Sequence, residues 1–165
     1  EAIKNLGKVI GFFAQRPEKD TGRGPDDLWQ IGNQEFLIIE CKNGAQSQII
    51  SKKDCNQLNG SIEWFGDEYG KQGCIGNPLM IHVGHTFGYA ASPNPGIRIM
   101  TRKTLDVLKS NVHRFACALN ASNFDDVNSV SDLLRVHGLR GEDIFTMYSV
   151  VPKKGTSLVN TRFVH

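Results

Sequence analysis

The chain has 165 residues, which corresponds to one domain with a substantial hydrophobic core. A net charge of only +2 excludes proteins that bind nucleic acid through a strongly basic overall composition, so any cationic surface must come from local clustering. The four cysteines form no Cys-x-x-Cys pair, which argues against a disulfide framework or a zinc finger and favours a reducing, cytoplasmic compartment. No apolar run approaches the roughly 18 residues of a membrane span, so no membrane partner is expected.

The first expected element is an amphipathic helix over residues 1–10, followed by Gly11 as a helix-ending glycine. Residues 12–16 then predict a strand that ends at Pro17, with continuation of the helix to Gln15 as the alternative. Residues 18–23 are rich in polar side chains, and we expect them to form a loop.

The stretch around which the chain is organised runs over residues 24–42 (GPDDLWQIGNQEFLIIECK). Two apolar runs flank a Gly-Asn turn signal at residues 32–33, which predicts a β-hairpin. Side chains alternate between the two faces of a strand. Along the second strand, one face therefore carries Phe36, Ile38, Glu40 and Lys42, and the other carries Leu37, Ile39 and Cys41.

A second helix is expected after a turn and short connector that covers residues 43–50. Ser51 and Asp54 form a capping box at its start. Lys53 and Gln57 lie four residues apart on one face, which we expect to look onto the edge of the sheet. The apolar stripe of this helix consists of Cys55, Leu58, Ile62, Phe65 and Tyr69.

The second half of the chain starts with a glycine-rich stretch over residues 66–76, expected to be a loop. A strand over residues 77–83, a long loop and a last short strand over residues 97–100 follow. Thr101 is expected to cap the next helix. The side chains of this helix that face inward are Leu105, Leu108, Val112, Phe115 and Leu119.

Residues 122–148 predict two short helices that break at Gly138. The order of elements indicates an α/β fold with a mixed central sheet of about four to five strands flanked by helices. We expect a single domain over residues 1–150. The core of this domain should cover residues 1–119, and a small C-terminal helical extension should cover residues 120–150. Residues 151–165 are expected to form a poorly ordered tail.

Polar residues at the ends of the hairpin strands are the strongest functional signal. Asp26 precedes Glu40 by 14 residues (40 − 26), and the hairpin should bring it near Glu40 and Lys42. Two carboxylates and a lysine at a sheet edge suit metal-assisted phosphodiester cleavage. Asp27 is the alternative to Asp26, but it points to the opposite face of the strand.

The pattern Pro25-Asp26 followed by Glu40-Cys41-Lys42 resembles the PD-(D/E)xK nuclease superfamily, which has the restriction-endonuclease-like fold. The helix with Lys53 and Gln57 resembles the glutamine-bearing helix of the exonuclease and RecB-like branches. The phrases LGKVIGFFAQRPE, GPDDLW and QLNGSIEWF resemble nuclease-like domains at the ends of some bacterial DEAD/DEAH-box helicases.

Each member of this candidate site has a chemical role. Asp26, Glu40 and the backbone carbonyl of Cys41 would hold Mg²⁺ or Mn²⁺. Lys42 would orient or deprotonate the attacking water, or offset charge in the transition state, and Gln57 would position a water or a phosphate. The resemblance also implies a carboxylate from the first helix, for which Glu1 is the candidate.

A nucleic-acid-binding surface is expected on the helix after Thr101. Arg102, Lys109 and His113 fall on one of its faces and would contact phosphates, with Lys53 on the preceding helix. The alternative is an ordinary solvated helix face. His82 and His85 would bind a metal only if the chain turns between them.

The sequence therefore predicts a divalent-metal-dependent endonuclease-type domain that hydrolyses DNA, works beside a helicase or within a larger repair or defence protein, and leaves a 5′-phosphate, as the resemblance implies. Two alternatives use the same fold. One is a catalytically silent module that only binds nucleic acid, and the other is a module that docks a helicase.

Overall fold

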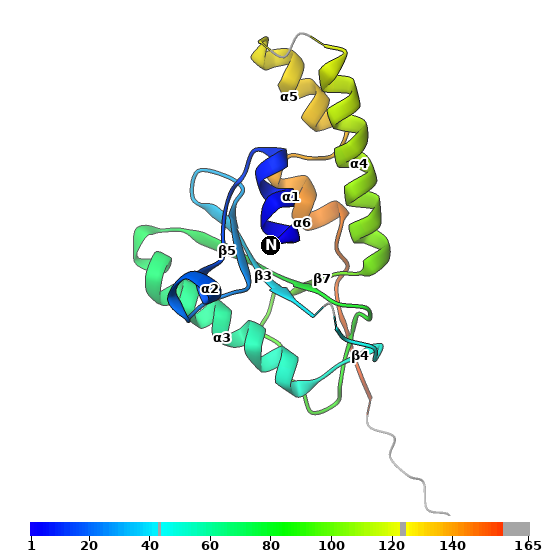
Figure 1. Cartoon of the computed structure of the whole chain (residues 1–165). Coiled ribbons are helices and arrows are strands. Elements are labelled where there is room, and N and C mark those ends of the chain that lie inside the picture. The colour runs from blue at the N-terminus through cyan, green and yellow to red at the C-terminus, as the bar shows by residue number, and fades with distance from the viewer. Residues whose placement is uncertain (43, 123–124, 157–165) are drawn as a thin grey trace, which may run out of the picture.

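The computed structural model describes residues 1–42, 44–122 and 125–156 (Figure 1). Its centre is a five-stranded mixed sheet in the order β1-β2-β3-β5-β7. The first three strands are antiparallel neighbours, whereas β3, β5 and β7 run parallel. The strands are β1 (Phe13–Gln15), β2 (Asp27–Gln30), β3 (Glu35–Cys41), β5 (Ile75–Ile81) and β7 (Arg98–Met100). The expected α/β fold with a mixed sheet of four to five strands is confirmed.

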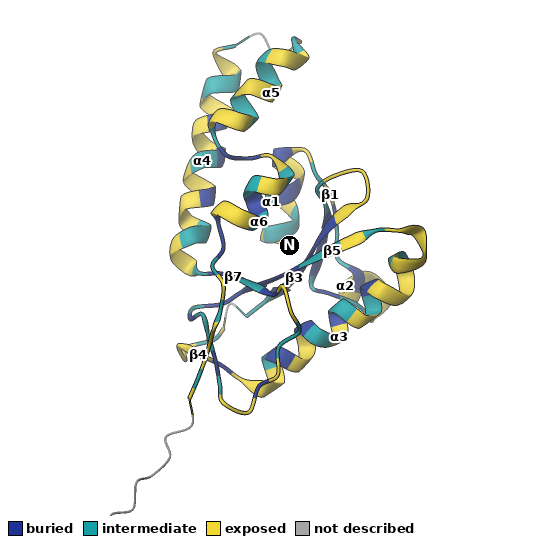
Figure 2. Cartoon of the chain, turned by 180° about the vertical axis from the view of Figure 1, so that it is seen from behind, coloured by how far each residue is buried: buried dark blue, intermediate teal, exposed yellow. Residues whose placement is uncertain are grey.

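Helices cover both faces of this sheet (Figure 1). One face packs against α1 (Ala2–Ile10), α4 (Arg102–Asn120) and α6 (Gly141–Met147). The other face packs against α3 (Lys52–Tyr69), and the short helix α2 (Pro17–Thr21) lies beside α3. The end of α4 and α5 (Val127–Val136) extend beyond the sheet, and α5 has no buried residue (Figure 2). None of the described helices is long and apolar enough to cross a membrane.

The central strand β3 divides its side chains between two cores, as its alternation predicts. Leu37 and Ile39 belong to the core on the α1 side, whereas Phe36 and Ile38 belong to the core on the α3 side. The alternation continues to Glu40, which contacts α3. The hydrophobic pattern therefore fixes the face on which the polar end of β3 lies.

Both predicted helix caps are present. The Ser51 hydroxyl accepts a hydrogen bond from the amide of Asp54 at 3.1 Å, and the Thr101 hydroxyl accepts one from the amide of Thr104 at 3.3 Å. The two predicted C-terminal helices are α5 and α6, and Gly138 lies between them in the left-handed conformation.

Two predictions near the N-terminus are wrong. The alternative in which the first helix continues to Gln15 fails because Gly11 takes a left-handed conformation and β1 follows. Residues 18–23, expected as a loop, belong largely to helix α2. Pro17 occupies the first turn of α2 and Gly22 ends it with φ of 76°, which are ordinary helix start and stop signals.

The prediction of a loop over residues 66–76 is also wrong at both ends. Helix α3 continues to Tyr69, a 3-10 helix covers Gly70–Gln72, and β5 begins at Ile75. The Tyr69 ring packs on Phe36 and Phe65, with centroid distances of 5.3 and 5.1 Å. This packing outweighs the cost of about 1 kcal/mol that a helical glycine carries.

A second, small parallel sheet in the order β4-β6-β8 was not predicted. It consists of β4 (Ile49–Ile50), β6 (Thr86–Phe87) and β8 (Lys153–Lys154). The expectation of an unordered tail from residue 151 is therefore wrong up to residue 156, and residues 157–165 lie outside the described part. A Cβ on Gly84 would lie 1.9 Å from the backbone oxygen of Gln48, so only glycine permits this close approach.

Asp27 is a buried carboxyl on the α1 side of the sheet. It is 2% exposed, and its Oδ1 atom has no hydrogen-bond partner among the described residues. Burial raises the pKa of Asp27 from 3.8 to about 6. The folded state therefore retains a proton between pH 4 and 6 that the unfolded state releases, and stability falls as the pH rises through this window.

We expect Asp27→Asn to stabilise the protein at pH 7.5, because it removes a buried charge that the N-terminal ammonium and Arg16 offset only in part. The difference between 3.8 and about 6 corresponds to a gain of up to about 3 kcal/mol at pH 7.5 and to little gain at pH 4. Urea unfolding at both pH values measures it. The exposed Asp67→Asn variant is the control, and an equal gain at both pH values would contradict the prediction.

Candidate functional site

Glu40 lies at the end of β3, where the strand leaves the core, and is only 3% exposed. The Ser61 hydroxyl donates a hydrogen bond of 2.6 Å to its Oε1 atom. The Lys42 ammonium donates one of 3.2 Å to Oε2. Burial is the main cause that raises the pKa of Glu40, and these two donors act in the opposite direction. The carboxylate is thus buried but held by two donors.

Lys42 is fixed by both backbone and side-chain contacts. Its amide donates to the carbonyl of Ile81 at 2.9 Å, which anchors it to the end of β5. Its ammonium lies between Glu40 and Gln57, with 2.9 Å to the Gln57 Oε1 atom. Gln57 and Ser61 are four residues apart and therefore share one face of α3. The predicted group of Glu40, Lys42 and Gln57 is brought together by this face.

Asp26 completes the predicted set from the hairpin's other strand. It lies immediately before β2, and its Oδ2 atom accepts a hydrogen bond of 2.7 Å from the amide of Cys41. Asp27 pairs with Ile39 in the sheet and points to the α1 side. The choice of Asp26 over Asp27 is therefore consistent with the positions of both carboxyls.

Glu18, on α2, is a member of the site that the sequence analysis missed. Its side chain forms a hydrogen bond with Asp26, which is the main cause that raises the pKa of Glu18. Its amide donates to the carbonyl of Pro25 at 3.2 Å. The signal that could have found it is the helix pattern of a proline followed five residues later by glycine. Glu1, the expected helix carboxylate, instead pairs with Arg16 at 3.8 Å.

A cavity of about 190 Å³ opens among these groups. Glu18 and Glu40 line it, Asp26 and Lys42 do not, and α3 contributes three of its lining residues. The lining residues are Glu18, Gly24, Glu40, Gln57, Gly60 and Ser61. The cavity is small and polar, which suits an ion with its waters and one phosphate group.

The three carboxyl groups raise the question of a divalent cation. No three Cys, His, Asp or Glu side chains among the described residues form a ready-made metal cage. Mg²⁺ needs none, because it is usually bound by one or two carboxylates, several waters and substrate phosphate. Glu18 and Asp26 share a hydrogen bond, and Asp26 raises the pKa of both Glu18 and Glu40. Such a crowded set of hard oxygen donors fits Mg²⁺ or Mn²⁺.

The remaining predicted metal ligands and cations differ in their surroundings. The Cys41 thiol is half-buried, and burial raises its pKa to about 12, so only its backbone carbonyl remains a candidate ligand. Lys53 is exposed on the first turn of α3. His82 is buried, and its Nδ1 atom lies 2.9 Å from the Gly84 amide, inside its own turn. His82 therefore has a structural role in this turn.

The predicted cationic face of α4 is only partly assembled. Arg102 and Lys109 line a hollow of about 340 Å³ that also contains Lys42. Lys109 pairs with Asp106 at 3.1 Å, and both side chains are more than half exposed. His113 does not line this hollow, and its Nδ1 atom lies 3.9 Å from the sulfur of Cys117.

Comparisons of the chain with protein-family models, with curated proteins and with solved structures find no significant match. The case for a function therefore depends on the residues and geometry of this site.

We expect Mn²⁺ to stabilise the protein by binding at the carboxylates. At ten times its dissociation constant, a ligand adds about 1.4 kcal/mol to the free energy of unfolding. Asp26→Asn and Glu40→Gln should each remove this gain, whereas Asp27→Asn, on the other face, should keep it. Thermal unfolding with Mn²⁺ or EDTA measures the effect. A gain that survives both substitutions would place the metal elsewhere.

Proposed function

We propose that this chain is a divalent-metal-dependent nuclease domain with a restriction-endonuclease-like core, which hydrolyses phosphodiester bonds of DNA. The observation that carries the proposal is the position of Lys42, whose ammonium lies between buried Glu40 and Gln57. The carboxyl of Asp26 is held at the same end of β3 by the amide of Cys41. At an ordinary solvated strand end, the carboxylate would be exposed. Glu40 is instead only 3% exposed and accepts a hydrogen bond from Ser61.

Asp26 and Glu40 would hold the cation, with Glu18 and the backbone carbonyl of Cys41 as the further ligands. When bound, Mg²⁺ or Mn²⁺ supplies Lewis-acid stabilisation of the phosphate and of the leaving oxygen. Ser61 keeps the Glu40 carboxylate oriented toward the cavity by its hydrogen bond to Oε1.

Lys42 would act on the phosphate itself. An ammonium has three N–H donors, and among the described residues Glu40 and Gln57 engage two of them. A third therefore remains for a non-bridging phosphate oxygen, whose negative charge grows as the water attacks. A fixed donor of this kind stabilises the transition state more than the ground state.

The reaction is a hydrolysis. The oxygen of water forms a bond to phosphorus, the bond from phosphorus to the 3′ oxygen breaks, and the 3′ oxygen takes up a proton. The products are a 5′-phosphate and a 3′-hydroxyl. We place this activity beside a helicase or within a larger repair or defence protein.

We expect Glu40→Ala and Lys42→Ala each to lower Mg²⁺-dependent cleavage of DNA by about 10²-fold or more, because each removes a group that contacts the cation or the phosphate. Glu18→Gln should lower it less. Cleavage of single-stranded and duplex DNA, followed on denaturing gels with Mg²⁺ and with EDTA, measures the change.

Glu63→Ala and Lys71→Ala, two exposed residues outside the site, are the matched controls. Circular dichroism should show all variants folded. Cleavage that persists in both Glu40→Ala and Lys42→Ala would contradict the proposal, and binding of DNA without cleavage under any of these conditions would favour a silent binding module.

The pH dependence gives a separate prediction for Ser61. Its hydrogen bond lowers the pKa of Glu40, so Ser61→Ala should raise that pKa further. Because ionised Glu40 is the active form, the acid limb of the cleavage rate against pH should move to higher pH. Ser61→Thr, which keeps the hydroxyl, should restore the original limb. An unchanged limb in Ser61→Ala would show that Ser61 does not tune Glu40.

A further inference from the structure

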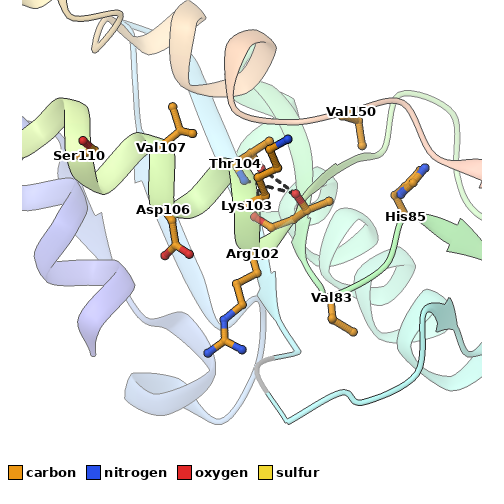
Figure 3. Close-up of a pocket in the computed structure, with 10 residues that line it drawn as sticks. Val83, His85, Arg102, Lys103, Thr104, Asp106, Val107, Ser110 and Val150 are labelled. Carbon is orange, nitrogen blue, oxygen red and sulfur yellow. Dashed lines mark hydrogen bonds between the residues drawn. The ribbon is translucent and has the colours of Figure 1, made fainter.

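A broad hollow of about 1070 Å³ lies at the beginning of α4, between this helix, the turn after β5 and the chain at Val150 (Figure 3). Small-molecule sites usually have volumes of roughly 300–1,000 Å³, so this hollow is large enough for a segment of a polymer. Its apolar walls come from Val83, Val107 and Val150, and Val107 is 48% exposed.

A smaller hollow of about 340 Å³ connects this surface to the candidate active site. The two hollows share Val83, Arg102 and Asp106, and the smaller one also contains Lys42. Because they share three lining residues, the two hollows adjoin, and we treat them as one groove that starts at Lys42 and continues past the ends of β5 and β7. We call it the α4 groove.

The charge of the α4 groove is positive. Arg102 and Lys103 are exposed at its rim, and Figure 3 shows their side chains pointing to different sides of the helix start. His85 stands across the larger hollow from them (Figure 3). Asp106 is the acidic residue among the groove's lining residues, and its carboxylate is paired with Lys109 at 3.1 Å.

We propose that the α4 groove binds a single-stranded segment of nucleic acid that leads away from the active site. The inference rests on the proposed nuclease function. Cations at the rim pair with phosphates, and the valine walls offer apolar surface on which the faces of unpaired bases can be buried. A duplex hides these faces in its base stack, so it would use the cations and leave the valines exposed. The combination of both surfaces therefore selects an unpaired strand.

Binding can be measured without cleavage. The full chain, in EDTA, is titrated into three fluorescein-labelled probes, and anisotropy is recorded at several salt concentrations. The probes are an oligo-dT of about 20 nucleotides, a duplex of the same length, and a poly-glutamate peptide. The variants are Arg102→Ala/Lys103→Ala and Val107→Ser. Their matched controls, at exposed positions outside the groove, are Lys8→Ala/Lys71→Ala and Val127→Ser.

The expected result is tighter binding of oligo-dT than of the duplex. Arg102→Ala/Lys103→Ala should weaken oligo-dT binding about tenfold and reduce the slope of log affinity against log salt by about 1.4, or about 0.7 for each cation. Val107→Ser should weaken oligo-dT binding severalfold and leave duplex binding unchanged. Both control variants should bind like the unmodified chain.

Three results would overturn the inference. They are equal affinity for duplex and oligo-dT, unchanged binding in Arg102→Ala/Lys103→Ala, and preference for the acidic peptide. Each is independent of the proposed chemistry, because cleavage is assayed separately with Mg²⁺. If the unmodified chain cleaves DNA and the Arg102→Ala/Lys103→Ala variant still binds oligo-dT normally, the nuclease proposal stands and the groove inference is wrong. If the chain binds oligo-dT through the α4 groove but cleaves no DNA, the groove inference stands and the nuclease proposal is wrong.

Discussion

The burial of one carboxylate, Glu40, is the constraint on which the rest of the candidate site depends. A charge moved out of water costs several kcal/mol unless neighbouring groups compensate it. Ser61 and Lys42 supply two donors, but burial still outweighs them and raises the pKa of Glu40. Lys42 and Ser61 therefore do not fully offset the cost of burying the Glu40 carboxylate. A second cation that binds near Glu40 during function would supply the missing compensation. The small polar cavity beside it is where such an ion would enter.

The candidate site forms only where helix α2, the β2–β3 hairpin and helix α3 meet. The hairpin aligns Asp26 with the end of β3, and the amide of Cys41 donates a hydrogen bond to the Asp26 Oδ2 atom, which ties the two strands together. Helix α3 contributes Gln57 and Ser61, while its neighbouring apolar stripe holds it on the sheet. Helix α2, which begins at a proline, brings Glu18 to Asp26. The polar site thus depends on the apolar packing of α3 against β3.

Much of this arrangement can be predicted from the sequence, because period-two and helical hydrophobic patterns are strong in β3, α3 and α4. The same patterns place Glu40 on the α3 side and Asp27 on the other. They fail where elements are short: α2 has five residues, and β4, β6 and β8 have two each. In such elements, pairing with distant segments decides the structure, and no periodicity can develop. Glu18 was missed because α2 is too short to show a helical period, although Pro17 and Gly22 mark the two ends of this helix.

The adjacent carboxyls Asp26 and Asp27 have opposite environments, and the burial of Asp27 lowers the stability of the fold at neutral pH. They lie on opposite faces, so the strand that presents Asp26 to the cavity also drives Asp27 into the apolar core, where its Oδ1 atom has no partner among the described residues. An asparagine at position 27 would fit the core without a charge, yet the chain carries an aspartate whose pKa is raised to about 6. The N-terminal ammonium and Arg16 oppose this rise in the pKa of Asp27 but do not cancel it. Because Asp27 lies with Ile39 on the α1 side, it is absent from the lining of the cavity, and the carboxyls that attract a cation there are those on the α3 side.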